Sequence, residues 1–102
     1  MARVVVMYKT PTDPAAFDRY YSATHVPIAH RIPGLRKYEV SQGAVASPGG
    51  ASGVHLVAIL SFDDMAAIGR AFASDEGKAA VADVGKFATG GVDILMFDQR
   101  EV

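Results

Sequence analysis

Histidine and tyrosine are the residues of this sequence best suited to chemistry, because the chain has three histidines and no cysteine. His25 closely follows Tyr20 and Tyr21 and stands two residues before Pro27, a residue that fixes the local backbone. An imidazole titrates near physiological pH, so His25 could serve as a general acid or base. The alternative is that His25 caps the end of a helix, where a ring N–H satisfies a free carbonyl.

Tyr21 is the tyrosine we expect in a ligand cleft. Adjacent helical residues lie about 100° apart, so Tyr20 and Tyr21 cannot both face one pocket, and Tyr21 is the one in line with Phe17. Its alternative role is core packing, with its hydroxyl bonded to the backbone. His55 lies in a strand and could line a cavity between sheet and helices, lie at a dimer interface, or be a structural histidine whose hydrogen bonds are satisfied.

Several classes of function find no support in the sequence. His25 and His30 are separated by a proline and lack a carboxylate at a supporting spacing, so we expect no metal site. The glycine-rich stretch 49–53 leads into a strand instead of opening a helix, so we expect no cofactor. No nucleophilic serine motif is present either. The net charge is −1 with scattered Lys and Arg, which argues against nucleic acid. The apolar run 57–60 is too short for a membrane span, and the lack of cysteine suits the cytoplasm.

The elements that position these side chains occur in the order strand, helix, strand, strand, helix, strand. Asp13 can cap the first helix with Pro14 in its first turn, and we expect the helix to end near Thr24 because Pro27 disfavours helical geometry in the preceding residue. A small-residue loop is expected at 43–53. Further helical segments begin after Asp63 or Asp64 and at Ser74. The strands are expected at 4–8, 35–42, 54–62 and 92–97.

This order predicts one α+β domain over residues 1–102, with a ferredoxin-like βαββαβ antiparallel sheet and its helices on one face. The other face is then bare, and we expect Tyr38, Val40 and one side of strand 54–62 on it. Half of the residues are hydrophobic, more than one small core needs. We therefore predict a homodimer in which two sheets pack face to face as a dimeric α+β barrel. The alternative is a monomer with a single core.

Two sequence segments carry a family resemblance. The run Tyr20-Tyr21-Ser22-Ala23-Thr24-His25-Val26-Pro27-Ile28-Ala29 and the run Ile32-Pro33-Gly34-Leu35-Arg36-Lys37-Tyr38 resemble the signature of the EthD family. The resemblance extends over nearly the whole chain. It implies the dimeric α+β barrel and an association with oxidative degradation of ethyl tert-butyl ether. Family members are often called reductases, which makes an oxidoreductase one possibility.

Two functions follow from these observations. The first is a protein that binds a small hydrophobic compound, accessory to an oxidative degradation or biosynthesis pathway. The second is a cofactor-independent enzyme of the isomerase, cyclase or mono-oxygenase type, with His25 as the acid or base and Tyr21 orienting the substrate. In both, the predicted ligand contacts are Phe17, Tyr21, His25, Ile28, His55 and Phe72.

Overall fold

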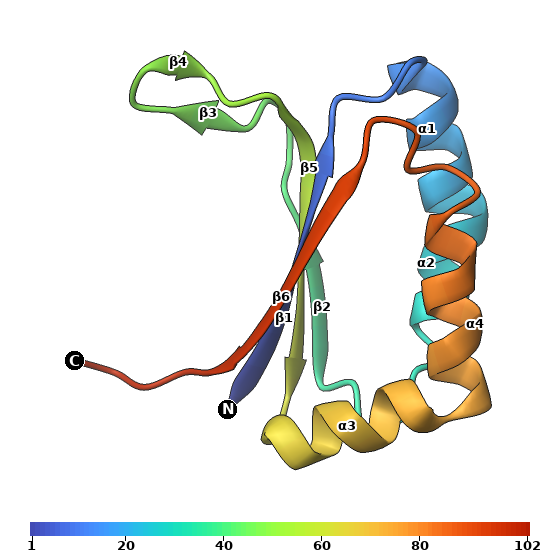
Figure 1. Ribbon diagram of the computed structural model, residues 1–102, viewed down its shortest axis with the longest axis vertical. Helices are drawn as coiled ribbons and strands as arrows, with labels where there is room; N and C mark the ends of the chain where they lie inside the picture. The colour runs from blue at the N-terminus through green and yellow to red at the C-terminus, as the bar shows by residue number, and fades with distance from the viewer.

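A computed structural model describes residues 1–102 and is built on a four-stranded antiparallel sheet in the order β2-β5-β1-β6. The strands are β1 (Ala2–Lys9), β2 (Lys37–Val40), β5 (Val54–Phe62) and β6 (Val92–Asp98). The helical segments are α1 (Pro14–Tyr20), η1 (Tyr21–His25), α2 (Val26–Ala29), α3 (Met65–Ala73) and α4 (Asp75–Val84). All of them lie on one side of the sheet (Figure 1). The predicted ferredoxin-like α+β fold is confirmed.

The core lies between the sheet and the helices. Successive side chains of a strand point to opposite faces, and β1 follows this rule closely. Val4, Val6 and Tyr8 are buried on the helix side, whereas Val5 and Met7 are only half-buried on the other side. Helices therefore cover one face of β1, whereas the other face is not covered.

The first helical region runs from Pro14 to Ala29 without a break, so the end predicted near Thr24 is wrong. Val26 keeps right-handed helical angles (φ −56°, ψ −48°) although Pro27 follows it. The π-helical turn η1 makes this possible: the Val26 N–H bonds the carbonyl of Tyr21, five residues earlier. This wider turn relieves the crowding that a proline ring causes against the preceding turn of a regular α-helix.

Three side-chain caps begin the main helices where the sequence predicted them. Asp13, Asp64 and Ser74 each accept a hydrogen bond from the backbone N–H three residues ahead, at 3.1, 2.7 and 3.0 Å respectively. Each cap satisfies an amide that the helix leaves without a partner. No helix is long and apolar enough to cross a membrane.

Strand β2 is shorter than predicted and presents the opposite face. Tyr38 points toward the helices and not onto the bare face, because it lies opposite Leu60, a core residue of β5. Directly opposed residues of an antiparallel pair share one face of the sheet. Val40 lies two residues further along this edge strand and also points to the helix side, where it is 47% exposed.

The sheet face away from the helices is uncovered and largely apolar. Leu95 and Phe97 on this face are 54% and 41% exposed. Residues 43–53, predicted as a loop, form a small hairpin of β3 (Ala46–Ser47) and β4 (Gly50–Ala51). The hairpin and the C-terminal tail both project on this side of the sheet (Figure 1). By register, the apolar residues of the bare face are Val5, Met7, Val57, Ile59, Leu95 and Phe97.

Candidate functional site

A buried histidine–aspartate pair joins two helices next to the sheet. His25 ends the π-helical turn η1 and Asp83 lies near the end of α4. His25 Nδ1 and Asp83 Oδ2 are 2.9 Å apart, and the Tyr20 hydroxyl donates to Asp83 Oδ1 at 2.7 Å. The side chains of His25 and Asp83 are 6% and 4% exposed. The alternative in which His25 caps a helix end is therefore wrong, because the helix continues and the ring bonds a residue of another helix.

One helical face presents both Tyr21 and His25 to the same space. Residues four apart lie on the same side of an α-helix, and the π-helical turn η1 keeps these two neighbours together. The ring centroids of Tyr21 and His25 are 5.2 Å apart. Such turns are frequent at functional sites, and here the turn holds both residues predicted to take part in catalysis.

The surroundings of Asp83 fix the tautomer of His25. Burial raises the pKa of the Asp83 carboxyl, but the hydrogen bonds from Tyr20 and His25 and the charge of nearby Lys86 outweigh it and hold that pKa below its usual value. Asp83 is therefore a carboxylate at neutral pH and can only accept hydrogen bonds. A neutral His25 ring must then carry its proton on Nδ1, which leaves a lone pair on Nε2. No group of the protein hydrogen-bonds to Nε2.

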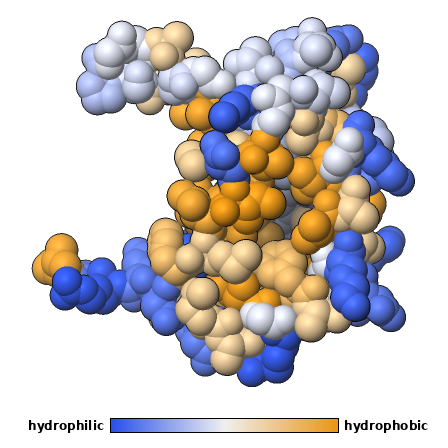
Figure 2. Space-filling model, in the orientation of Figure 1, coloured by the Kyte–Doolittle hydropathy of each residue, from blue (hydrophilic) through white to orange (hydrophobic).

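The His25 ring lies in the wall of an apolar cavity of about 300 Å³ between sheet and helices. Figure 2 shows the hollow walled by hydrophobic residues, and it opens to the surface beside β6, where Ile94 and Met96 are 41% and 48% exposed. This volume is at the lower end of the range for small-molecule sites. Fifteen of the 16 lining residues are hydrophobic. The lining consists of Val4, Val6, Tyr8, Tyr21, His25, Ala29, Ile32, Tyr38, Ala58, Leu60, Phe72, Ala80, Val81, Val84, Ile94 and Met96.

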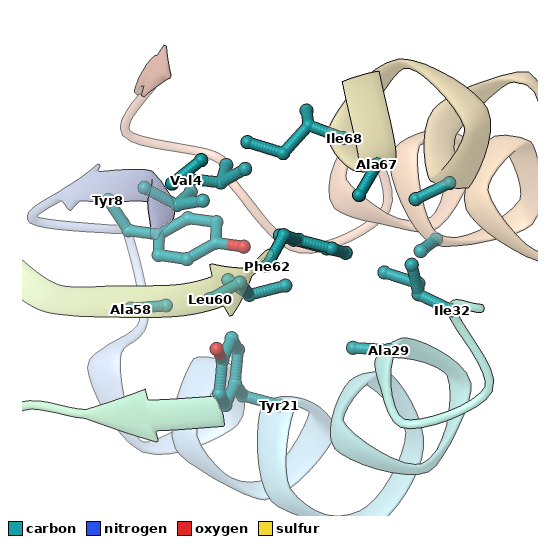
Figure 3. Close-up of a cluster of buried hydrophobic side chains, with 14 of the residues drawn as sticks. Val4, Tyr8, Tyr21, Ala29, Ile32, Ala58, Leu60, Phe62, Ala67 and Ile68 are labelled. Carbon is teal, nitrogen blue, oxygen red and sulfur yellow. The ribbon is translucent and has the colours of Figure 1, made fainter. Parts of the chain in front are cut away.

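Three tyrosines supply the remaining polar atoms of the cavity wall. Tyr21 is buried in the core, as the packing alternative expected, but its hydroxyl lies 2.5 Å from that of Tyr38 and bonds this side chain instead of the backbone. Burial raises the pKa of the Tyr8 and Tyr21 hydroxyls, with the neighbouring Tyr38 hydroxyl adding to the effect. Figure 3 shows Tyr8 and Tyr21 entering the layer between strands and helices from the two sides.

The structure brings three of the six predicted ligand contacts to this cavity, namely Tyr21, His25 and Phe72. The other three lie elsewhere. Phe17 is 3% exposed and packs within the aromatic core, its ring centroid 5.4 Å from that of Tyr8. Ile28 is half-buried beside a shallow surface groove.

The remaining histidines are dispersed over the molecule. His55 lies outside the cavity, with its Nε2 2.7 Å from Asp18 Oδ1 and its ring on the edge of Phe17. The His30 ring is exposed, and its centroid lies 5.3 Å from that of Tyr38. No three His, Asp or Glu side chains come together in a way that could hold a metal ion.

Asp83, Tyr8 and Tyr38 are polar site residues that the sequence did not single out. A signal for Asp83 was available: it stands three residues after Ala80 and four before Phe87, both buried, so it is an acidic residue on an apolar stripe. No local signal places Tyr38, because the pairing of β2 with β5 decides which face it occupies.

Comparison with known proteins identifies one family. The model of the EthD domain matches residues 9–91. An uncharacterized 11.0 kDa protein in the thcB-thcC intergenic region of Rhodococcus erythropolis is 41% identical over 102 residues, covering 100% of this chain and 98% of that protein. The crystal structure of an EthD family protein from Bacillus halodurans is 35% identical, with a TM-score of 0.90, covering 98% of this chain and 99% of that one.

More distant structures share the fold alone. One is SnoaB from Streptomyces nogalater, described as a cofactor-independent oxygenase, at 20% identity and a TM-score of 0.66, covering 99% of this chain and 94% of that one. Another is a dimeric protein of unknown function with a ferredoxin-like fold from Bacteroides fragilis, at 16% identity and a TM-score of 0.65, covering 96% of this chain and 95% of that one. Structural relatives of this chain thus include dimeric ferredoxin-like proteins.

Proposed function

The chain belongs to the EthD family, and we propose that it is a cofactor-independent acid–base catalyst acting on a small, mainly apolar compound. The observation that carries the proposal is the buried His25–Asp83 pair, which leaves the lone pair of His25 Nε2 free in the cavity wall. A carboxylate that holds an imidazole in one tautomer also stabilises the imidazolium formed when the ring takes a proton. Asp83 and His25 therefore have the chemistry of a general base and its orienting group.

The apolar wall of the cavity supports this role. An apolar lining offers few groups that bind water, so a charge that develops beside the buried pair interacts with it more strongly than it would in bulk solvent. The distant fold relative SnoaB is described as a cofactor-independent oxygenase, which is consistent with chemistry of this kind on the same scaffold.

A second candidate function is binding without turnover, accessory to an oxidative degradation or biosynthesis pathway. It is favoured by the composition of the cavity, in which fifteen of the 16 lining residues are hydrophobic. In that case the His25–Asp83 pair would be structural, and the cavity would only shield or deliver its ligand.

The two candidates are distinguished by a probe that needs only a base. 5-Nitrobenzisoxazole is small and apolar; removal of its ring C–H proton breaks the N–O bond and gives a coloured cyanophenolate. We expect the protein to accelerate this elimination above free imidazole at equal concentration, and His25→Ala to lose about a hundredfold of the rate or more. His55→Ala removes a histidine that also bonds an aspartate but lies outside the cavity, and it should keep the rate. Equal rates in wild type and His25→Ala would exclude the catalytic role, and saturable binding without acceleration would favour the second candidate.

We also propose that the chain forms a homodimer through the bare sheet face. Six apolar side chains of that face are covered by no element of the chain, and a second copy would bury them symmetrically. Leu95→Lys places a charge on this face, whereas Met65→Lys places one at a helix residue that is 39% exposed. We expect sedimentation analysis to find a dimer for wild type and Met65→Lys and a monomer for Leu95→Lys. A monomeric wild type at micromolar concentration would contradict the proposal.

A further inference from the structure

The cavity wall contains hydroxyl protons that no group of the protein accepts. The Tyr21 and Tyr38 hydroxyls bond each other, and because each phenol has a single O–H, one donates to the other and the second proton is left over. Tyr8 is 1% exposed, yet its hydroxyl makes no hydrogen bond within the protein. No fully enclosed side-chain nitrogen or oxygen lacks a partner, so the unbonded Tyr8 oxygen is not fully enclosed, and the residue lines the cavity. Two donors therefore remain for a ligand.

These hydroxyls act as donors and not as bases. Burial raises the pKa of Tyr8, Tyr21 and Tyr38, so all three stay protonated across the physiological range. A buried tyrosine hydroxyl normally has a hydrogen-bond partner in a folded protein. Two free donors in an apolar wall point to a ligand that brings an acceptor atom to them.

The donors and the base lie close together. The ring centroid of Tyr21 is 5.7 Å from that of Tyr8 and 5.2 Å from that of His25. These rings are close enough for one small molecule to contact both the tyrosines and His25.

The charges of the cavity restrict the acceptor to a neutral group. His25 is the one lining residue that can become cationic, and Asp83 already neutralises it. A carboxylate or phosphate would lose its hydration without gaining a counter-charge, which is strongly unfavourable. A carbonyl oxygen loses far less on burial and accepts two hydrogen bonds.

We propose that the substrate is an enolisable ketone, bound with its carbonyl oxygen at the hydroxyls of Tyr8 and the Tyr21–Tyr38 pair and an α-carbon at His25. This substrate class rests on the proposed acid–base function. His25 Nε2 takes the α-proton, the electron pair of that C–H bond forms the C=C bond of an enolate, and the negative charge moves to the oxygen. Hydrogen bonds to this oxygen strengthen as the charge develops, which is how such donors accelerate enolisation. Return of the proton from the imidazolium to the oxygen, which gives the enol, or to either face of the α-carbon completes the step without a further reactant.

The test compares two ligands that differ only in the oxygen. 2-Tetralone is an enolisable bicyclic ketone and tetralin is its hydrocarbon counterpart. A purely apolar cavity would prefer tetralin, because a buried carbonyl without donors forfeits its hydrogen bonds to water. We expect NMR titrations of the wild-type protein to show tighter binding of 2-tetralone.

The variants assign that preference to the hydroxyls. Tyr8→Phe should weaken 2-tetralone binding about three- to tenfold and leave tetralin binding unchanged, the effect of one lost hydrogen bond. At the pair, the double variant Tyr21→Phe/Tyr38→Phe is required, because either single change still leaves one free O–H. Tyr20→Phe removes a hydroxyl that bonds Asp83 outside the cavity wall and should keep the ratio of the two affinities.

Each outcome bears on a separate claim. Tighter binding of tetralin by the wild-type protein, or equal weakening of both ligands in Tyr8→Phe, would overturn the substrate class even if His25→Ala abolishes the benzisoxazole elimination. An intact elimination rate in His25→Ala would instead overturn the acid–base function, while a hydroxyl-dependent ketone preference would still assign a carbonyl to the site. The Tyr8 hydroxyl bonds nothing in the protein, so Tyr8→Phe keeps the packing of the ring and tests the claim if the double variant does not fold.

Discussion

Replacing Asp83 by Asn is the sharpest test of the proposed base, because it changes the proton on His25 with little change in shape. The Tyr20 hydroxyl donates to Asp83 Oδ1, so the amide oxygen of Asn takes that place. The amide nitrogen then faces His25 Nδ1 and can only donate. Nδ1 must accept, and the proton of the neutral ring moves to Nε2. The lone pair in the cavity wall is lost.

The structure sets the size of the two expected effects. A general base contributes about a hundredfold to ten-thousandfold in rate, so Asp83→Asn should reduce benzisoxazole elimination by about a hundredfold or more. Both bonds of the carboxylate, at 2.7 and 2.9 Å, have amide counterparts, and no buried charge is left without a partner. The free energy of unfolding should therefore fall by only about 1 kcal/mol, the difference between charged and neutral hydrogen bonds.

Three measurements check this reasoning. Nitrogen-15 NMR of the histidine rings reports the tautomer of His25, urea unfolding reports stability, and the elimination assay reports the rate. Asp18→Asn is the matched control, because Asp18 bonds His55 at 2.7 Å outside the cavity, and it should leave the tautomer of His25 and the rate unchanged. An Asp83→Asn protein that keeps the proton of His25 on Nδ1, or keeps the full rate, would refute the assignment.

Three further predictions concern stability and are checked by urea unfolding. Ala58→Val adds methyl groups to a strand residue that lines the cavity, so we expect the free energy of unfolding to rise by about 1 kcal/mol while 2-tetralone binding weakens; lower stability would mean that the space is already filled. Gly69→Ala in α3 should raise the free energy of unfolding by about 1 kcal/mol through helix propensity, because no atom lies near the added Cβ. Gly77→Ala in α4 should lower it, because the added Cβ would lie 2.8 Å from the Cα of Phe72. Stabilisation by both substitutions would contradict the close contact. The folded-state pKa of Asp83 is lowered, so wild type should be more stable than Asp83→Asn above about pH 4, the unfolded-state pKa of an aspartate. This difference in the free energy of unfolding should be lost as pH falls through the lower folded-state pKa. A difference that stays constant down to pH 2 would contradict the lowered pKa.

Much of the fold follows from local patterns in the sequence. Runs of apolar, β-branched and aromatic residues predicted the main strands, and the caps Asp13 and Ser74 predicted two helix starts. Two errors mark what those patterns do not specify. The helix continues through Pro27 because a π-helical turn precedes it, and no residue pattern had indicated that turn. The face of Tyr38 depends instead on distant packing, because its pairing with β5 decides it.

The site was predictable only in part, for the same reason. His25 and Tyr21 were found because their types and the adjacent proline stand together in the chain. Asp83 is 58 residues away from His25, and the packing of α4 against η1 joins them. A search for acidic residues on apolar helical stripes would have found Asp83, because such a residue needs a buried partner.

The cavity lowers the stability of this small domain, which supports the proposal that it binds a ligand. Filling 300 Å³ would gain up to about 7 kcal/mol, at about 24 cal/mol for each Å³, and the opening beside β6 makes this an upper bound. A domain of this size is stable by about 5 to 15 kcal/mol in total. Alanine lines the cavity at positions 29, 58 and 80, where a larger apolar residue would reduce the space. Stability is supplied beside the cavity by the packing of Tyr8, Phe17 and Phe87, whose ring centroids are 5.2 to 5.4 Å apart and in which Phe17 meets the other two rings edge to face. This cluster fixes the Tyr8 ring and leaves its hydroxyl free, so the stability of the core and the polar atoms of the site come from the same side chain.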